Sequence, residues 1–105
     1  MEYRKLGSTG LTVSAIGFGC WGIGGRTAGA TSYGDTDDRI SRDALARAFE
    51  SGITFFDTSP AYGDGHSEKL IGEVFGGRRD RIVIATKAGY ESWNAAPDYS
   101  PGAIR

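Results

Sequence analysis

Three side chains that can take part in proton transfer stand out in this sequence: Asp57, Tyr62 and Lys87. A carboxylate, a phenol and an amine form a proton-transfer set, because an ammonium beside a phenol stabilises the phenolate and helps the phenol give up its proton. A carboxylate paired with the ammonium would hold that cation in place. Each residue also has an ordinary role, since Asp57 can cap a turn, Tyr62 can pack in a loop and Lys87 can be a solvated charge. The placement of all three residues together favours a role in proton transfer over these ordinary roles.

The elements that must position these side chains alternate between apolar strands and amphipathic helices. The predicted strands are short apolar runs without polar alternation: Ala15–Gly19, Ile53–Asp57 and Ile82–Lys87. Such runs are typical of a parallel sheet covered on both faces. Their last residues are 38 and 30 positions apart, the length of a βαβ unit. Ligand sites of parallel α/β proteins lie beyond the carboxyl ends of the strands, so one rim would carry all three residues.

Two helices are predicted between these strands from apolar residues at helical spacing. The first can be capped by Asp37 or Asp38, ends before Gly52 and has an apolar side made of Ile40, Ala44, Leu45, Ala48 and Phe49. The second is capped by Ser67, ends at Gly76-Gly77 and has an apolar side made of Leu70, Ile71, Val74 and Phe75.

The remaining segments predict turns and loops. Tyr3–Leu6 and Leu11–Val13 flank a glycine-bracketed turn and predict a hairpin. About Cys20 to Thr36 the chain is glycine-rich and shows neither periodicity, and a loop of that length is usually functional or disordered. Ser100 followed by Pro101 predicts the start of a third helix.

The composition excludes several classes of function. The chain has 105 residues and a formal net charge of −1, so no basic surplus favours nucleic acid. Its longest charge-free apolar stretch, around Ile16–Ile23, is much shorter than the roughly 20 residues of a membrane span. No secretory leader is expected from the polar N-terminus, and the single cysteine suits a reducing compartment, so we expect a cytoplasmic protein. One histidine and one cysteine argue against a transition-metal site.

Competing motifs are weaker. Residues 17–22 fit G-x-G-x-x-G, but the chain continues through more loop where a dinucleotide-binding helix should begin at once. There is no P-loop sequence. Cys20 has no evident base beside it and is interpreted as a small buried residue. His66 is interpreted as an exposed loop residue.

One long stretch resembles the signature of the aldo-keto reductases. It runs GITFFDTSPAYGDGHSEKLIGEVF, followed at matching spacing by IATK, and the opening YRKLGSTGLTVSAIGFGCWGIGG also resembles that family. The similarity is greatest to bacterial members related to potassium-channel β-subunits and to pyridoxal or sugar-type dehydrogenases. The resemblance implies the N-terminal part of a (β/α)8 TIM barrel, with residues 1–14 as a hairpin plug and residues 15–105 as the first three βα units, the third helix truncated. It also implies NADPH- or NADH-dependent reduction of aldehydes or ketones.

The resemblance assigns roles to individual residues. Tyr62 would be the general acid that protonates the carbonyl oxygen, Lys87 would stabilise the phenolate, and Asp57 would pair with Lys87. Trp21 and Asp57 would also contact the nicotinamide ribose of the cofactor. The family's catalytic histidine, at the end of a fourth strand, and its phosphate-binding loops after the seventh and eighth strands have no counterpart in these residues. A TIM barrel needs about 250 residues, so the chain is expected to be an incomplete fragment.

Two functions of different classes therefore stand at this point. The first is a reductase acting on small-molecule carbonyl compounds, represented here by its N-terminal segment. The second is a non-catalytic, truncated barrel module that needs self-association or a complementing chain to cover its open sheet, because unpaired strand edges favour association. The sequence determines neither the substrate nor the choice between NADPH and NADH.

Overall fold

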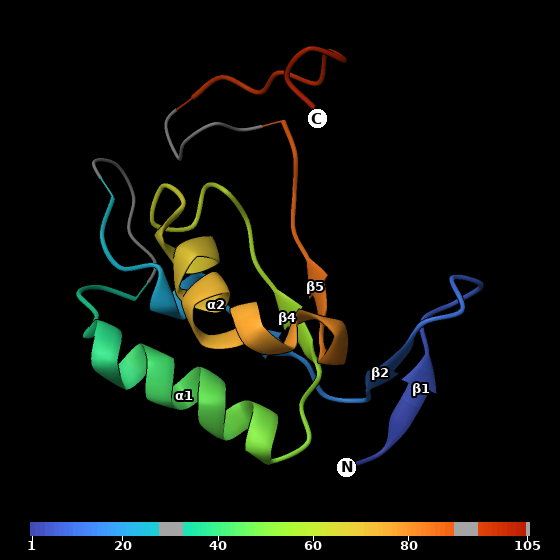
Figure 1. Cartoon of the computed structure of the whole chain (residues 1–105). Coiled ribbons are helices and arrows are strands. Elements are labelled where there is room, and N and C mark those ends of the chain that lie inside the picture. Colours follow the sequence, from blue (N-terminus) through green and yellow to red (C-terminus); the bar gives the residue numbers. More distant parts are fainter. Residues whose placement is uncertain (28–32, 90–94, 105) are drawn as a thin grey trace.

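An antiparallel hairpin opens the chain in the computed structural model, which describes residues 1–27, 33–89 and 95–104. Strands β1 (Tyr3–Lys5) and β2 (Thr12–Ser14) pair as predicted, within one residue of the expected ends. The hairpin is fastened to the segment before the central sheet, because the Ser14 and Thr54 hydroxyls each accept a hydrogen bond from the other residue's backbone N–H, at 2.9 and 3.0 Å. In Figure 1 it lies at the edge of the molecule, away from the helices.

The central sheet contains three parallel strands in the order β3 (Phe18–Gly19), β4 (Phe55–Asp57) and β5 (Val83–Ala85). The order and direction agree with the prediction. The regular strands are shorter than the apolar runs, because residues flanking a ladder can be buried without pairing. Backbone bonds from Cys20 to Asp57 and from Thr58 to Ala85, both 2.8 Å, extend the ladder by one residue at the carboxyl ends.

Two helices connect these strands. Helix α1 (Asp38–Glu50) is capped by the Asp37 side chain, and Gly52 beyond its end has a φ of +99°, which favours glycine. Ile40 does not join the buried side: it is 59% exposed. The inward residues of α1 are Ser41, Leu45 and Ala48, and Ile40 lies one position, about 100° around the helix, from the first of them.

Helix α2 (His66–Phe75) begins two residues earlier than predicted. The prediction that Ser67 caps it is wrong, because the capping position is Gly65, in a left-handed conformation with φ of +95°. Ser67 is the second helical residue and is fully buried. A short 3-10 segment, η2 (Gly76–Arg81), follows α2 and leads into β5.

The core lies on one face of the sheet, between the strands and the two helices. Phe56 is fully buried and packs against Phe75 of α2, with 4.7 Å between ring centroids, and Leu45 of α1 joins the same cluster. Figure 1 shows α1 and α2 side by side on this face. The sequence predicted a sheet covered on both faces; within the described residues the helices cover one face, and Phe55 and Val83 on the other stay partly exposed. No helix in the described ranges is long and apolar enough to cross a membrane.

The loop after β3 contains one 3-10 turn, η1 (Trp21–Ile23), while residues 28–32 of the predicted Cys20–Thr36 loop lie outside the described part. The predicted third helix is present only as a turn among residues 95–104. There the N–H groups of Ala103 and Ile104 donate to the Ser100 carbonyl, and the Asp98 side chain accepts from the Ser100 N–H. These hydrogen bonds resemble those at the start of a helix, but no helix follows in the described residues.

Candidate functional site

Asp57 and Lys87 meet at the carboxyl edge of the sheet. The Lys87 Nζ donates to Asp57 Oδ1 at 3.0 Å and to the Thr58 carbonyl at 2.8 Å. Asp57 pairs in register with Ala85, two residues before Lys87, so both side chains leave the sheet on the same face. About half of each side chain is exposed, 49% for Asp57 and 47% for Lys87. The pair is therefore fixed in position but open to solvent.

Tyr62 lies in the loop between β4 and α2, over the same ion pair. The centroid of its ring is 5.0 Å from the Lys87 Nζ. The loop is held against the loop after β3: a Cβ on Gly24 would lie 2.9 Å from the Tyr62 carbonyl carbon, and one on Gly63 would collide with the Gly24 carbonyl. Gly63 also has a φ of +64°. Two glycines thus let the backbones touch and set the position of Tyr62.

Trp21 adds an aromatic surface beside Tyr62. The ring centroids of the two residues are 6.3 Å apart, with 37° between the planes, and Tyr33 packs on Trp21 with centroids 5.3 Å apart. The structure therefore places all four residues singled out in the sequence at one edge: a carboxylate, an ammonium, a phenol and an indole.

The charges of this group act on Lys87. Partial burial alone would lower the pKa of Lys87, but hydrogen bonding to Asp57 and to Tyr62, together with their charges, outweighs it and raises the pKa above its usual value. Lys87 is thus a stable cation at neutral pH. Its positive charge stands beside the Tyr62 ring.

Cys20 follows β3 and has a different character. Its side chain has no exposed surface, and burial, with the nearby Asp57 charge, raises the pKa of the thiol to about 12 despite the opposing effect of Lys87. A thiol that stays protonated is a poor nucleophile. The interpretation of Cys20 as a buried structural residue is confirmed.

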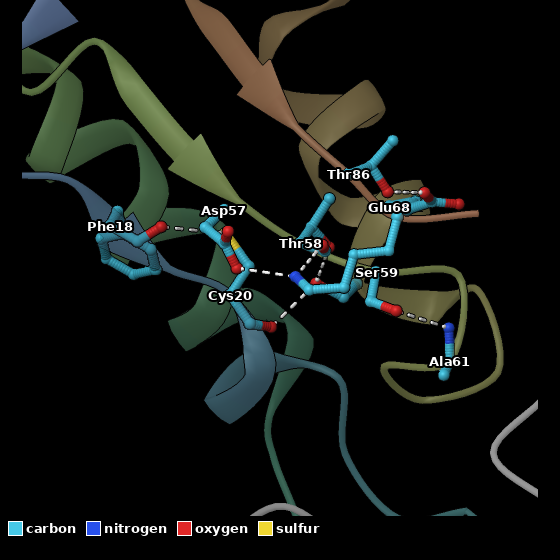
Figure 2. Close-up of polar contacts among 10 residues, drawn as sticks. Phe18, Cys20, Asp57, Thr58, Ser59, Ala61, Glu68 and Thr86 are labelled. Carbon is cyan, nitrogen blue, oxygen red and sulfur yellow. Dashed lines mark hydrogen bonds and ion pairs between the residues drawn. The ribbon is translucent and has the colours of Figure 1, made fainter. Parts of the chain in front are cut away.

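A chain of buried hydroxyl groups beneath the ion pair was not predicted. The Ser67 Oγ donates to the Cys20 carbonyl at 2.8 Å and lies 2.9 Å from the Thr58 Oγ1. Thr58 and Ser67 are at most 1% exposed. Figure 2 shows Thr58 beside Asp57 and Cys20 at the end of the strands. The signal in the sequence was a Thr directly after a predicted strand and a Ser in the first turn of a predicted helix, but the contact between them spans the fold.

His66 is not the exposed loop residue that the sequence suggested. It is the first residue of α2, and its Nε2 lies 2.7 Å from Oδ1 of Asp38, the first residue of α1. The hydrogen bond from His66, with the charges of His66, Arg42 and Lys69, lowers the pKa of Asp38. No group of three or more potential metal ligands gathers in the part of the chain described here.

Parallel strands joined by helices, with a carboxylate, an ammonium, a phenol and an indole gathered at their carboxyl edge, define a parallel α/β protein with a candidate functional site. Comparison with known families then identifies it: residues 15–105 match the aldo/keto reductase family, and the chain belongs to that family.

Individual relatives agree. The chain is 43% identical over 89 residues to aldo-keto reductase YhdN of Bacillus subtilis (strain 168), covering 83% of this chain and 25% of that protein. It is 40% identical over 111 aligned residues to Schizosaccharomyces pombe aldo-keto reductase yakc [NADP(+)], covering 96% and 30%. It is 39% identical over 90 residues to the Escherichia coli (strain K12) NADH-specific methylglyoxal reductase, covering 85% and 27%.

The fold agrees as well. The solved structure of aldo-keto reductase AKR11C1 from Bacillus halodurans, in its holo form, superposes with a TM-score of 0.78 at 30% identity, covering 99% of this chain and 33% of that one. The hairpin and the three parallel strands thus align with the N-terminal third of an aldo-keto reductase TIM barrel. The chain spans between a quarter and a third of the length of these proteins.

Proposed function

We propose that this chain supplies the proton-donating part of an NADPH- or NADH-dependent reductase that converts small aldehydes or ketones to alcohols. The observation that carries the proposal is the contact of Lys87 with both Asp57 and Tyr62 at the carboxyl edge of a parallel sheet. Family membership supports the same reaction. A reducing compartment supplied with reduced nicotinamide, such as the cytoplasm, is the setting we expect.

In this proposal Tyr62 is the general acid. Its hydroxyl donates a proton to the carbonyl oxygen as negative charge develops there, and the resulting phenolate is stabilised by the Lys87 ammonium. Asp57 holds that ammonium in place through the 3.0 Å contact. Because the site is half exposed to water, solvent can return the proton to the phenolate after each turnover.

The described residues fit the nicotinamide-ribose end of the cofactor. Lys87 donates to Oδ1 of Asp57, and the other carboxylate oxygen would accept from a ribose hydroxyl. The Trp21 indole offers a flat surface next to Tyr62. When bound, the reduced nicotinamide would supply the hydride for the carbonyl carbon. No glycine-rich phosphate-binding loop is recognised among the described residues, so they would hold one end of the cofactor. One relative's name specifies NADP(+) and another's specifies NADH, so the cofactor choice stays open.

The test replaces Tyr62 by phenylalanine and follows NADPH or NADH oxidation with a small reactive aldehyde. Tyr62→Phe keeps the ring but removes the hydroxyl that would donate the proton, and we expect the rate to fall by about 10²- to 10⁴-fold. Tyr3→Phe, in the hairpin, removes a hydroxyl of the same type that binds the Gly52 carbonyl and serves as the control. Equal rates for Tyr62→Phe and the unchanged protein would refute the assignment.

The second candidate is the non-catalytic module. One observation favours it: among the described residues, β3 and β5 each pair with β4 alone, which leaves two open sheet edges. If this candidate is correct, the chain oxidises no cofactor and sediments as an oligomer or as a complex with a complementing chain. A monomer with carbonyl-dependent cofactor oxidation would exclude it.

A further inference from the structure

We propose that the Thr58 and Ser67 hydroxyls are a positioning device for Lys87, holding the ammonium where it can act on Tyr62. The inference rests on the proposed function and adds two residues to it. The Lys87 ammonium donates to the Thr58 carbonyl, so the two hydroxyls act through the Thr58 main chain, as positioning residues and not as catalytic ones.

The first step is the direct link. The Thr58 carbonyl accepts the second hydrogen bond of the Lys87 ammonium, at 2.8 Å, while Asp57 Oδ1 accepts the other at 3.0 Å. The two acceptors come from consecutive residues. A displacement of the Thr58 peptide would therefore move the Lys87 ammonium. If that peptide rotated so that its carbonyl pointed away from Lys87, the hydrogen bond would be lost.

The second step is how that peptide is held. The Thr58 N–H donates to the Ala85 carbonyl of β5 at 2.8 Å, which is a ladder bond. The Thr58 side chain provides the other anchor, through its 2.9 Å contact with the Ser67 Oγ. One residue is thus fixed to β5 through its backbone and to α2 through its hydroxyl.

The third step is the direction of the hydroxyl chain. Each hydroxyl has a single hydrogen to donate. The Ser67 Oγ donates to the Cys20 carbonyl, so the hydrogen between the two side chains must come from Thr58. The order is Thr58 to Ser67 to Cys20, and every group is satisfied. All three residues are at most 1% exposed. Loss of the Thr58 hydroxyl therefore removes its link to α2, and loss of the Ser67 hydroxyl leaves both the Thr58 hydroxyl and the Cys20 carbonyl without this partner.

The deciding experiment compares Thr58→Val with Thr58→Ser. Valine keeps the volume and removes the hydroxyl, whereas serine keeps the hydroxyl and loses a methyl group. We expect Thr58→Val to lose about tenfold or more in kcat for aldehyde reduction. We also expect it to lower the pKa of Lys87, followed by NMR of its side chain, because the ammonium loses the displaced Thr58 carbonyl as an acceptor. Thr58→Ser should stay close to the unchanged protein in both. A role in packing alone predicts the reverse order, and that result would overturn the proposal.

Ser67→Ala gives an independent readout, with Ser41→Ala as its control. Both serines are buried in the first turn or so of a helix, but Ser41 belongs to α1 and lies outside the hydroxyl chain. We expect a lower pKa of Lys87 only in Ser67→Ala, and equal values in the two variants would contradict the proposal. If the unchanged protein reduces no carbonyl compound, the proposed function fails, while the pKa of Lys87 still decides the positioning role.

Discussion

The two faces of the three-stranded sheet differ in what their side chains do. On the helix-covered face, Phe56 and Thr58 are buried, one in the aromatic core and one in the hydroxyl chain. On the opposite face, Asp57 and Lys87 are half exposed and charged. Along β4 and one residue beyond it, Phe56, Asp57 and Thr58 alternate between the two faces, because successive side chains of a strand point to opposite faces, and Lys87 joins Asp57 from beyond β5.

The difference separates stability from chemistry. An ion pair that is half exposed contributes only about 0–1 kcal/mol to stability, so the open face can be altered without unfolding the protein. Apolar groups without exposed surface dominate the free energy of unfolding. Substitutions on the helix-covered face should therefore lower the free energy of unfolding, and substitutions on the open face should lower the rate of carbonyl reduction.

The largest effect is expected from Phe56→Ala. Phe56 is 0% exposed and contacts Phe75 and Phe18, with ring centroids 4.7 and 6.0 Å away. Removing the ring should cost about 3–5 kcal/mol of the free energy of unfolding, as measured by urea denaturation with circular dichroism. Phe55→Ala, on the partly exposed face, is the control and should cost clearly less. Equal losses would mean that the faces do not differ as described.

Lys87→Met tests the other face. Methionine keeps an unbranched apolar side chain and removes the ammonium, so we expect kcat for aldehyde reduction to fall about 10²- to 10⁴-fold, with a change of less than about 1 kcal/mol in the free energy of unfolding. Lys69→Met, at an exposed position of α2, controls for loss of charge. A large loss of stability in Lys87→Met with normal kcat would reverse the comparison.

Much of this fold could be predicted from the sequence because its signals are local. Apolar runs, helical spacing and the turn glycines at 7 and 10 gave the order and type of the elements, and the strands end within a few residues of expectation. Two of the errors concern features that local spacing does not determine: which way a side chain points, and which residue caps a helix. Ile40 matched the helical spacing but turns away from the sheet, and the expected Ser67 cap gave way to a left-handed Gly65.

The site divides in the same way. Asp57 and Lys87 could be predicted to meet because both end strands of a parallel sheet, and such ends share an edge. The bond from Ser67 to Cys20 joins residues 47 positions apart through a hydroxyl that has no distinctive motif. The contact of His66 with Asp38 depends on how two helix starts are placed side by side. No local pattern encodes either contact.

The smallest predicted effect concerns the contact of His66 with Asp38, between the starts of the two helices. The hydrogen bond from His66 holds the pKa of Asp38 below its ordinary value of 3.8. The folded protein therefore binds that proton less readily than the unfolded chain, so the contribution to stability is present above that value and disappears as the pH falls through the lowered pKa. Asp38→Asn removes this dependence, and its melting temperature should fall less than that of the unchanged protein between pH 5 and pH 3, by scanning calorimetry. Asp43→Asn removes another carboxylate of α1 and should leave the acid sensitivity as it is. If both variants lose stability in acid as the unchanged protein does, the pair between the two helix starts makes no energetic contribution, and α1 and α2 are held together by their apolar contacts and by the ion pair of Arg42 with Glu73.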